Sequence, residues 1–168
     1  MKQLLITTHL YTFAVICVIA TTISSCTFKK KTDMETLTGT KENELTMLVG
    51  TYTSGDSKGI YSFRFNEETG TATALSETEV ENPSYLAVSA DGKFIYTVSE
   101  FNNEQAAANA FAFNQEKGTL KLLNSQKTGG EDPCYIITNG NNVITANYSG
   151  GSISVFPIAK DGSLLPAS

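Results

Sequence analysis

A repeat of 48 residues constrains this 168-residue chain more than any other feature of its sequence. Three apolar runs each end in a polar loop, and the residues at those three ends are Tyr52, Glu100 and Tyr148. A strand follows each loop and ends in a turn, and the glycines of these turns, 48 and 44 residues apart, are Gly70, Gly118 and Gly162. A period of about 40–50 residues that carries only short strands and turns is typical of propeller blades and not of helical solenoids.

Residues 83–127 show what one repeat contains. They read as four consecutive strands separated by an Asp-Gly turn, a polar loop and a Gly-Thr turn, and the strand sequences are SYLAVSA, KFIYTVSE, ANAFAFN and TLKLLNSQK. Period-two alternation and the wealth of β-branched and aromatic residues favour strands over helices. We therefore predict an all-β fold, a β-propeller built of four-stranded antiparallel meander blades.

The repeats divide residues 46–168 into incomplete blades. Residues 46–81 supply a first blade without its opening strand, 82–130 a complete second blade, and 131–168 a third. At about 48 residues a blade this makes about two and a half blades, whereas propellers have about four to eight. We therefore expect the sequence to be an amino-terminal fragment of a propeller. Its open strand edges are expected to favour self-association.

The first 45 residues are interpreted as targeting sequence. Lys2 precedes an apolar stretch over residues 10–20, and the sequence Ile-Ser-Ser-Cys that ends at Cys26 resembles a bacterial lipobox. This resemblance implies a lipoprotein signal peptide over 1–25, a lipid on Cys26, a polar tether over 26–45 and a periplasm-facing protein anchored in the bacterial cell envelope. An uncleaved membrane anchor and an ordinary signal peptide are the alternatives. Without Lys2 the formal charge of −5 becomes −6, so nucleic acid is not an expected partner.

Cysteine and histidine usage argues against several kinds of site. Cys17 and Cys26 lie in the leader and at the lipobox, so Cys134 is the remaining thiol, and we interpret it as a small buried hydrophobe at the start of a strand. The single histidine, His9, also lies in the leader. We therefore expect no disulfide framework, no metal site, no cofactor and no catalytic thiol in the repeats.

One face of the predicted blades collects the polar residues. In an up-and-down blade, the loop after the second strand and the connection after the fourth emerge on the same face. The segments that this places together are 51–54, 82–85, 100–102, 132–135 and 147–149, while the opposite face receives glycine turns. Propellers bind ligands in the funnel over their central channel, so this face is the expected ligand face.

Three segments of the chain resemble a known family. They are LVGTYTSGDSKGIYSF, NPSYLAVSADGKFIYTVSE and ANYSGGSISVFPIAKDGSL, and in order and spacing they are similar to the amino-terminal third of the seven-bladed propeller lactonases. That family includes the propeller-type 6-phosphogluconolactonase of bacteria and the fungal carboxy-muconate cyclase. The resemblance covers residues 46–168. It implies hydrolysis of a sugar lactone to its open-chain acid, by activated water and with stabilisation of the tetrahedral intermediate.

The resemblance places most of the catalytic equipment in later blades. The family's histidine, arginines and glutamate have no counterpart here, where Arg64 lies in a third strand. Glu100 is the best candidate for a catalytic general base, because it ends a second strand beside the ligand face, although a solvated loop carboxylate is the alternative. Amide and phenol groups suit sugar hydroxyls. The candidate substrate-binding residues, each of which could instead bond a neighbouring blade, are Tyr52, Ser84, Tyr85, Asn147 and Tyr148.

The charges near the ligand face disfavour a phosphorylated substrate. They come from Glu77, Glu79, Glu81, Glu131 and Asp132, against one cation, Lys58. A periplasmic location also disagrees with phosphorylated sugar lactones, which are cytosolic, so a different lactone is compatible with the sequence. Two other functions remain open. One is a non-catalytic propeller that binds sugar or protein, and the other is a lyase or cyclase acting on an aromatic-derived lactone.

Overall fold

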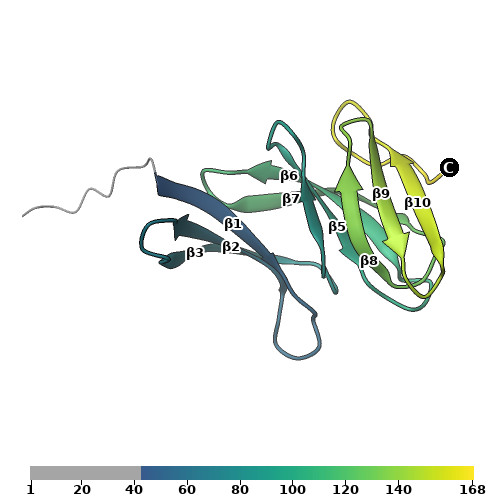
Figure 1. Ribbon diagram of the computed structural model, residues 1–168, viewed down its shortest axis with the longest axis horizontal. Helices are drawn as coiled ribbons and strands as arrows, with labels where there is room; N and C mark the ends of the chain where they lie inside the picture. Colours follow the sequence, from purple (N-terminus) through teal and green to yellow (C-terminus); the bar gives the residue numbers. More distant parts are fainter. Residues whose placement is uncertain (1–42) are drawn as a thin grey trace, which may run out of the picture. The chain divides into compact units, whose positions relative to one another are not determined.

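The computed structural model describes residues 43–168 and consists of β-strands and loops (Figure 1). Ten strands form three antiparallel sheets, one for each sequence repeat. The prediction of an all-β fold of antiparallel meanders is therefore confirmed. The predicted signal peptide, the lipidation of Cys26 and most of the tether lie outside the described residues. No helix within residues 43–168 is long and apolar enough to cross a membrane.

The first sheet has three strands in the order β1-β2-β3, which are β1 (Glu44–Gly50), β2 (Gly59–Asn66) and β3 (Ala72–Glu79). Glu44 pairs with Asn66 and Gly50 with Ile60, so the β1–β2 register is continuous over the whole of β1. β1 begins two residues before the predicted start of the repeats. Within the described residues β1 bonds β2 on one side only, which leaves its other edge open.

The second sheet is a complete four-stranded meander and the third repeats its first three strands. The second sheet has the order β4-β5-β6-β7, with β4 (Leu86–Val88), β5 (Phe94–Ser99), β6 (Ala107–Asn114) and β7 (Thr119–Lys127). The third has the order β10-β9-β8, with β8 (Pro133–Thr138), β9 (Asn142–Asn147) and β10 (Ser152–Pro157). Beyond β10 the chain turns back, and the amide of Leu165 donates to the carbonyl of Pro157 at 2.8 Å.

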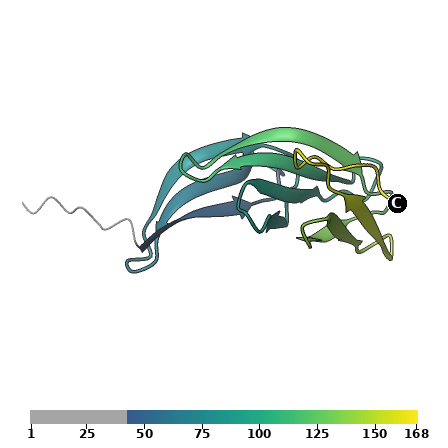
Figure 2. The same cartoon turned by 90° about the horizontal axis from the view of Figure 1, so that it is seen from above.

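The repeat extends to irregularities of the strands. The register of β2 against β3 shifts between Ser62 and Phe63, and that of β6 against β7 shifts between Ala110 and Phe111. These two shifts are 48 residues apart, like the sequence repeat. A bulge bends its strand and increases the local twist, and Figure 2 shows the long strands of both sheets curved along their length.

The hydrophobic core lies between neighbouring sheets. Alternate residues of β5 point to opposite sides, because side chains of a strand alternate between its faces. Ile95 therefore packs toward the first sheet in a cluster with Ile60 and Phe111. Tyr96 packs toward the third sheet in a larger cluster, whose other buried members are Val98, Ala108, Ala110, Ile136, Val143, Phe156 and Leu164. Sheets stacked face to face in this way are the packing expected of propeller blades.

Two of the three turn glycines of the repeat touch the preceding sheet. Gly118 has a φ of +68°, and a Cβ on it would lie 2.5 Å from the Ser62 hydroxyl oxygen. Gly162 has a φ of +88°, and a Cβ on it would lie 2.2 Å from the Phe94 ring. The carbonyls of both glycines accept hydrogen bonds from the sheet they touch, that of Gly118 from Ser76 at 2.7 Å and that of Gly162 from Tyr96 at 3.2 Å. Glycine is thus required here both by its backbone conformation and by the close approach of a neighbouring sheet.

Candidate functional site

Two of the three residues that define the repeat meet across the first and second sheets. Tyr52 follows β1 and Glu100 follows β5, and the Tyr52 hydroxyl donates to Oε2 of Glu100 at 2.9 Å. Ser84, which precedes β4, donates its hydroxyl to the same carboxylate oxygen. No hydrogen bond to the other oxygen, Oε1, is formed among residues 43–168. The structure therefore holds the carboxylate by one oxygen, while the other has no hydrogen-bond partner among these residues and is not buried.

Asn82 fixes the backbone on which this carboxylate group is built. Its side-chain oxygen accepts from the Thr53 amide and hydroxyl, both at 3.0 Å, and its amide nitrogen donates to the Glu100 carbonyl at 3.2 Å. Its own carbonyl accepts from the Glu100 amide at 3.0 Å. Asn82 has a φ of +46°, a left-handed conformation that asparagine tolerates better than most residues. It therefore ties the end of β1 to the end of β5.

The third sheet has the same backbone arrangement, 50 residues later. Asp132 has a φ of +49°, and its carbonyl accepts from the amide of Tyr148 at 2.8 Å, as that of Asn82 accepts from Glu100. The Ser149 hydroxyl donates to the Asp132 carboxylate. Sequence reasoning did not single out Asn82 as a site residue. The signal for it was the polar residue before proline in both connections, Asn82-Pro83 and Asp132-Pro133.

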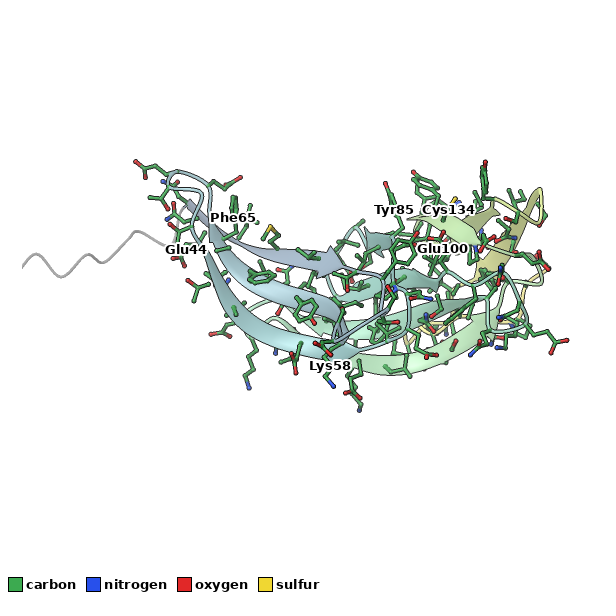
Figure 3. All side chains as sticks on the ribbon, turned by 90° about the horizontal axis from the view of Figure 1, so that it is seen from below. Glu44, Lys58, Phe65, Tyr85, Glu100 and Cys134 are labelled. Atoms are coloured by element: carbon green, nitrogen blue, oxygen red, sulfur yellow. The ribbon has the colours of Figure 1, made fainter. Side chains whose placement is uncertain are left out.

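Two tyrosines at equivalent positions of the second and third sheets form an aromatic pair. The ring centroids of Tyr85 and Tyr135 are 4.8 Å apart, with an interplanar angle of 56°. Both side chains remain about two fifths exposed. Figure 3 shows Tyr85 in the same region of the domain as Glu100 and Cys134, and away from Glu44 and Phe65. The pair provides an apolar surface beside the carboxylate, of the kind that packs against ligand rings.

The other predicted substrate-binding residues are placed differently. Tyr148 is 81% exposed and forms no side-chain hydrogen bond within the described residues. Asn147 is buried, and its amide group donates to Ser152 at 3.1 Å and to Ser154 at 2.8 Å while its oxygen accepts from Thr145 at 3.1 Å. The structure does not bring Asn147 together with Glu100 at an open surface, because its side chain stabilises the third sheet from within.

The exposure of Cys134 differs from what its sequence position led us to expect. We expected a buried hydrophobe, but the structure places this residue at the exposed start of β8, with Sγ 3.9 Å from the Ala146 carbonyl oxygen. The buried side chains of this strand are Pro133 and Ile136. The prediction of burial was wrong because the pairing of β8 with β9 shifts between Pro133 and Tyr135, which the apolar sequence pattern does not reveal.

The electrostatics of the site are dominated by the carboxylate. The hydrogen bond to Glu100 raises the pKa of Tyr52 above its ordinary value, and desolvation and the negative charge of Glu100 act in the same direction. Lys58, the one cation expected to help bind phosphate, pairs with Glu79 at 3.2 Å. Arg64 donates to the Glu116 carbonyl at 2.6 Å and to Thr46 at 3.0 Å, and so ties the first sheet to the second.

The site as described has the groups of a proton-transfer centre. It contains one carboxylate with an open oxygen, two hydroxyls that hold it and an adjacent aromatic surface. Among residues 43–168, no three histidine, cysteine, aspartate or glutamate side chains are grouped so as to hold a metal ion. An open carboxylate oxygen can accept a hydrogen bond from a substrate hydroxyl or take a proton from water.

Antiparallel meander sheets stacked face to face are the blades of which β-propellers are built. Among known protein families, residues 46–168 match the one described as lactonase, 7-bladed β-propeller. The chain belongs to this family of seven-bladed propeller lactonases.

Relatives of known structure or name agree with this assignment. A Bacteroides fragilis protein, whose crystal structure carries the provisional description 6-phosphogluconolactonase, is 71% identical with a TM-score of 0.75, covering 76% of this chain and 36% of that one. The periplasmic gluconolactonase of Pseudomonas aeruginosa is 32% identical with a TM-score of 0.67, covering 74% and 37%. The 6-phosphogluconolactonase of Bacillus subtilis is 38% identical over 122 residues, 69% of this chain and 34% of that protein. The chain thus spans about a third of the length of these relatives.

Proposed function

We propose that the protein is a lactonase that hydrolyses a sugar lactone to its open-chain acid. The observation that carries the proposal is membership of the propeller lactonase family, together with a carboxylate held at the expected ligand face by Tyr52 and Ser84. Relatives named 6-phosphogluconolactonase and gluconolactonase support the reaction class.

In the proposed reaction Glu100 acts as the general base. Its open oxygen takes a proton from water as the water oxygen attacks the lactone carbonyl carbon. The tetrahedral intermediate then collapses, the ring C–O bond breaks, and the leaving alkoxide takes up the proton that Glu100 had accepted, which gives a hydroxyl and a carboxylic acid and regenerates the base. Tyr85 and Tyr148 are proposed to contact the sugar. The donors that stabilise the oxyanion are proposed to come from blades beyond these residues.

The proposed substrate is an unphosphorylated sugar lactone. Both cations of residues 43–81 are engaged, Lys58 with the Glu79 carboxylate and Arg64 with the backbone carbonyl of Glu116. The carboxylates of Glu100 and Asp132 belong to the proposed ligand face, where they would repel a phosphate. The periplasmic gluconolactonase of Pseudomonas aeruginosa is a relative whose name carries no phosphate.

We further propose a periplasm-facing protein anchored by a lipid on Cys26. The lipobox-like sequence before Cys26 and the periplasmic relative support this location. Metabolic labelling with a fatty-acid analogue tests it. Label is expected in the wild-type protein and in Cys17→Ser but not in Cys26→Ser, and equal labelling of the two variants would contradict the anchor.

A non-catalytic sugar-binding or protein-binding propeller is the second candidate. It is favoured by the partly exposed aromatic pair of Tyr85 and Tyr135, because such a surface can bind a ligand without any chemical step. This alternative predicts ligand binding without turnover.

The deciding experiment is a lactone hydrolysis assay with the protein made from its complete gene. Acid release from gluconolactone and from 6-phosphogluconolactone is followed at constant pH, with the spontaneous rate subtracted. We expect turnover that Glu100→Gln lowers by roughly 100-fold or more, as for loss of a general base. Glu104→Gln, at an exposed loop carboxylate, is the matched control and should retain the rate. Binding without acid release would instead support the second candidate.

The open edge of β1 suggests a role in assembly. A groove of about 730 Å³ runs beside this edge, and its apolar lining residues are Leu45, Leu48, Leu86, Val88 and Phe113. An unpaired edge with an apolar neighbour is a template for another strand. We propose that residues 43–168, produced alone, associate through this edge. Size-exclusion chromatography that shows a compact monomer would contradict this.

A further inference from the structure

Tyr52 and Ser84 approach the candidate base from two different sheets. Tyr52 follows β1 of the first sheet, while Ser84 precedes β4 of the second. Both hydroxyls donate to the same oxygen, Oε2 of Glu100. We propose that Tyr52 and Ser84 are positioning residues that hold Glu100 so that Oε1 faces the substrate, and are not substrate ligands themselves. This inference rests on the proposed lactonase function.

The argument starts from the freedom of a glutamate carboxylate. The last torsion of a glutamate side chain is broad and roughly two-fold, so a solvated carboxylate presents either oxygen in many orientations. A carboxylate oxygen has about two acceptor positions, and two hydroxyl donors fill those of Oε2. Rotation of the carboxylate would break both hydrogen bonds. The two hydroxyls therefore select one orientation of Glu100.

The backbone supports the same orientation. Asn82 bonds Thr53, the neighbour of Tyr52, and also both the amide and the carbonyl of Glu100. Tyr52 and Glu100 therefore do not rely on flexible loops to meet, since the chain segments that carry them are tied together directly. The position of the base is set by contact between the first two sheets, and a disturbance of that contact would misplace it.

A positioning role and a binding role predict different kinetics. A group that orients the base acts in the chemical step, so its removal lowers kcat with little change in KM, whereas a group that binds substrate equally in ground and transition states changes KM. Loss of one hydrogen bond to a charged group corresponds to roughly a 10-fold change in rate. In the protein made from its complete gene, Tyr52→Phe and Ser84→Ala are each expected to lower kcat about 10-fold and to leave KM within about two-fold.

Two further variants control the measurement. Ser84→Thr keeps a hydroxyl at this position and is expected to restore most of the rate. Ser125→Ala removes an exposed hydroxyl of β7 that forms no hydrogen bond within the described residues, and should match the wild type. A raised KM with unchanged kcat in Tyr52→Phe would overturn the positioning role. So would a rate for Ser84→Thr as low as that of Ser84→Ala.

A titration separates failure of this inference from failure of the proposed function. Ionisation of Tyr52 is measured as the ultraviolet difference between the wild type and Tyr52→Phe at alkaline pH. Because Glu100 raises the pKa of Tyr52, the pKa should fall when Glu100 is replaced by Gln. An unchanged pKa would overturn the contact, and with it the positioning role, whether or not the protein is a lactonase. A lowered pKa with no effect of Glu100→Gln on hydrolysis would support the contact but refute Glu100 as the base.

Discussion

Gly162 offers a quantitative test of how the second and third sheets pack. The change is Gly162→Ala, compared with Gly140→Ala. Both glycines have a φ of +88°, but a Cβ on Gly140 meets nothing within 4 Å, whereas on Gly162 it lies 2.2 Å from Cε1 of Phe94. A comparison of the two variants therefore separates the cost of backbone strain, which both share, from the cost of steric overlap, which only Gly162→Ala carries.

The expected magnitudes follow from these geometries. Alanine in a left-handed conformation is destabilised by about 1–2 kcal/mol, and the reduced freedom of the unfolded chain offsets about 0.4–1 kcal/mol of this. Gly140→Ala should thus lower the free energy of unfolding by roughly 0–1.5 kcal/mol. At Gly162 the ring of Phe94 must in addition move by about 1 Å, and overpacking of this kind destabilises by about 1–3 kcal/mol more.

The free energy of unfolding of both variants is measured by urea titration. Tyrosine fluorescence reports the unfolding, because the chain contains no tryptophan. The informative quantity is the difference in unfolding free energy between Gly162→Ala and Gly140→Ala, at unchanged m-value. Equal destabilisation of the two would show that the Gly162 turn does not touch Phe94 in solution. It would thereby refute the packing of the third sheet on the second described above.

Three further predictions concern single side chains. Asn147→Ala should lower the free energy of unfolding by about 2–3 kcal/mol in the same urea assay, because it leaves buried hydroxyls without hydrogen-bond partners. The control is Asn141→Ala at an exposed position, which should change this free energy by less than about 0.5 kcal/mol. The pKa of Tyr52 is raised in the folded protein, so its contribution to stability is present below the unfolded value and lost as pH rises through the folded one. Wild type and Tyr52→Phe should therefore differ less in unfolding free energy at pH 11 than at pH 8, and a constant difference would contradict this. Cys134 is exposed, so maleimide should label it in the native protein, as read by peptide mass spectrometry, and protection until unfolding would argue for burial.

Regular features of the fold were predictable because they depend on local pattern. Alternating apolar residues, turn glycines and a 48-residue period are sufficient to indicate antiparallel meanders, and the strands from β5 to β7 lie where the pattern predicts them. The choice of Glu100 also came from position, since it ends a second strand. These features repeat along the chain, so each one supports the reading of the others.

The contacts of the site were less predictable. The sequence showed Tyr52 and Glu100 at equivalent positions, but equivalence in a repeat does not imply contact. Their hydrogen bond depends on how far the first sheet is rotated against the second, which Asn82 and the packing of Ile60 on Ile95 determine. Asn147 and Ser99 occupy equivalent positions as the last residues of β9 and β5, and both are buried. The pattern gave no sign of which polar residues face inward.

The sequence by itself determined the repeat, the strand content and the family, because these follow from residues close together in the chain. The tertiary structure decided which residue of each repeat is accessible and which carboxylate oxygen is open. Exposure of Cys134 and burial of Asn147 both result from strand register and sheet stacking. These are set by contacts between residues far apart in sequence, and a one-residue shift of register moves a side chain to the opposite face of its sheet.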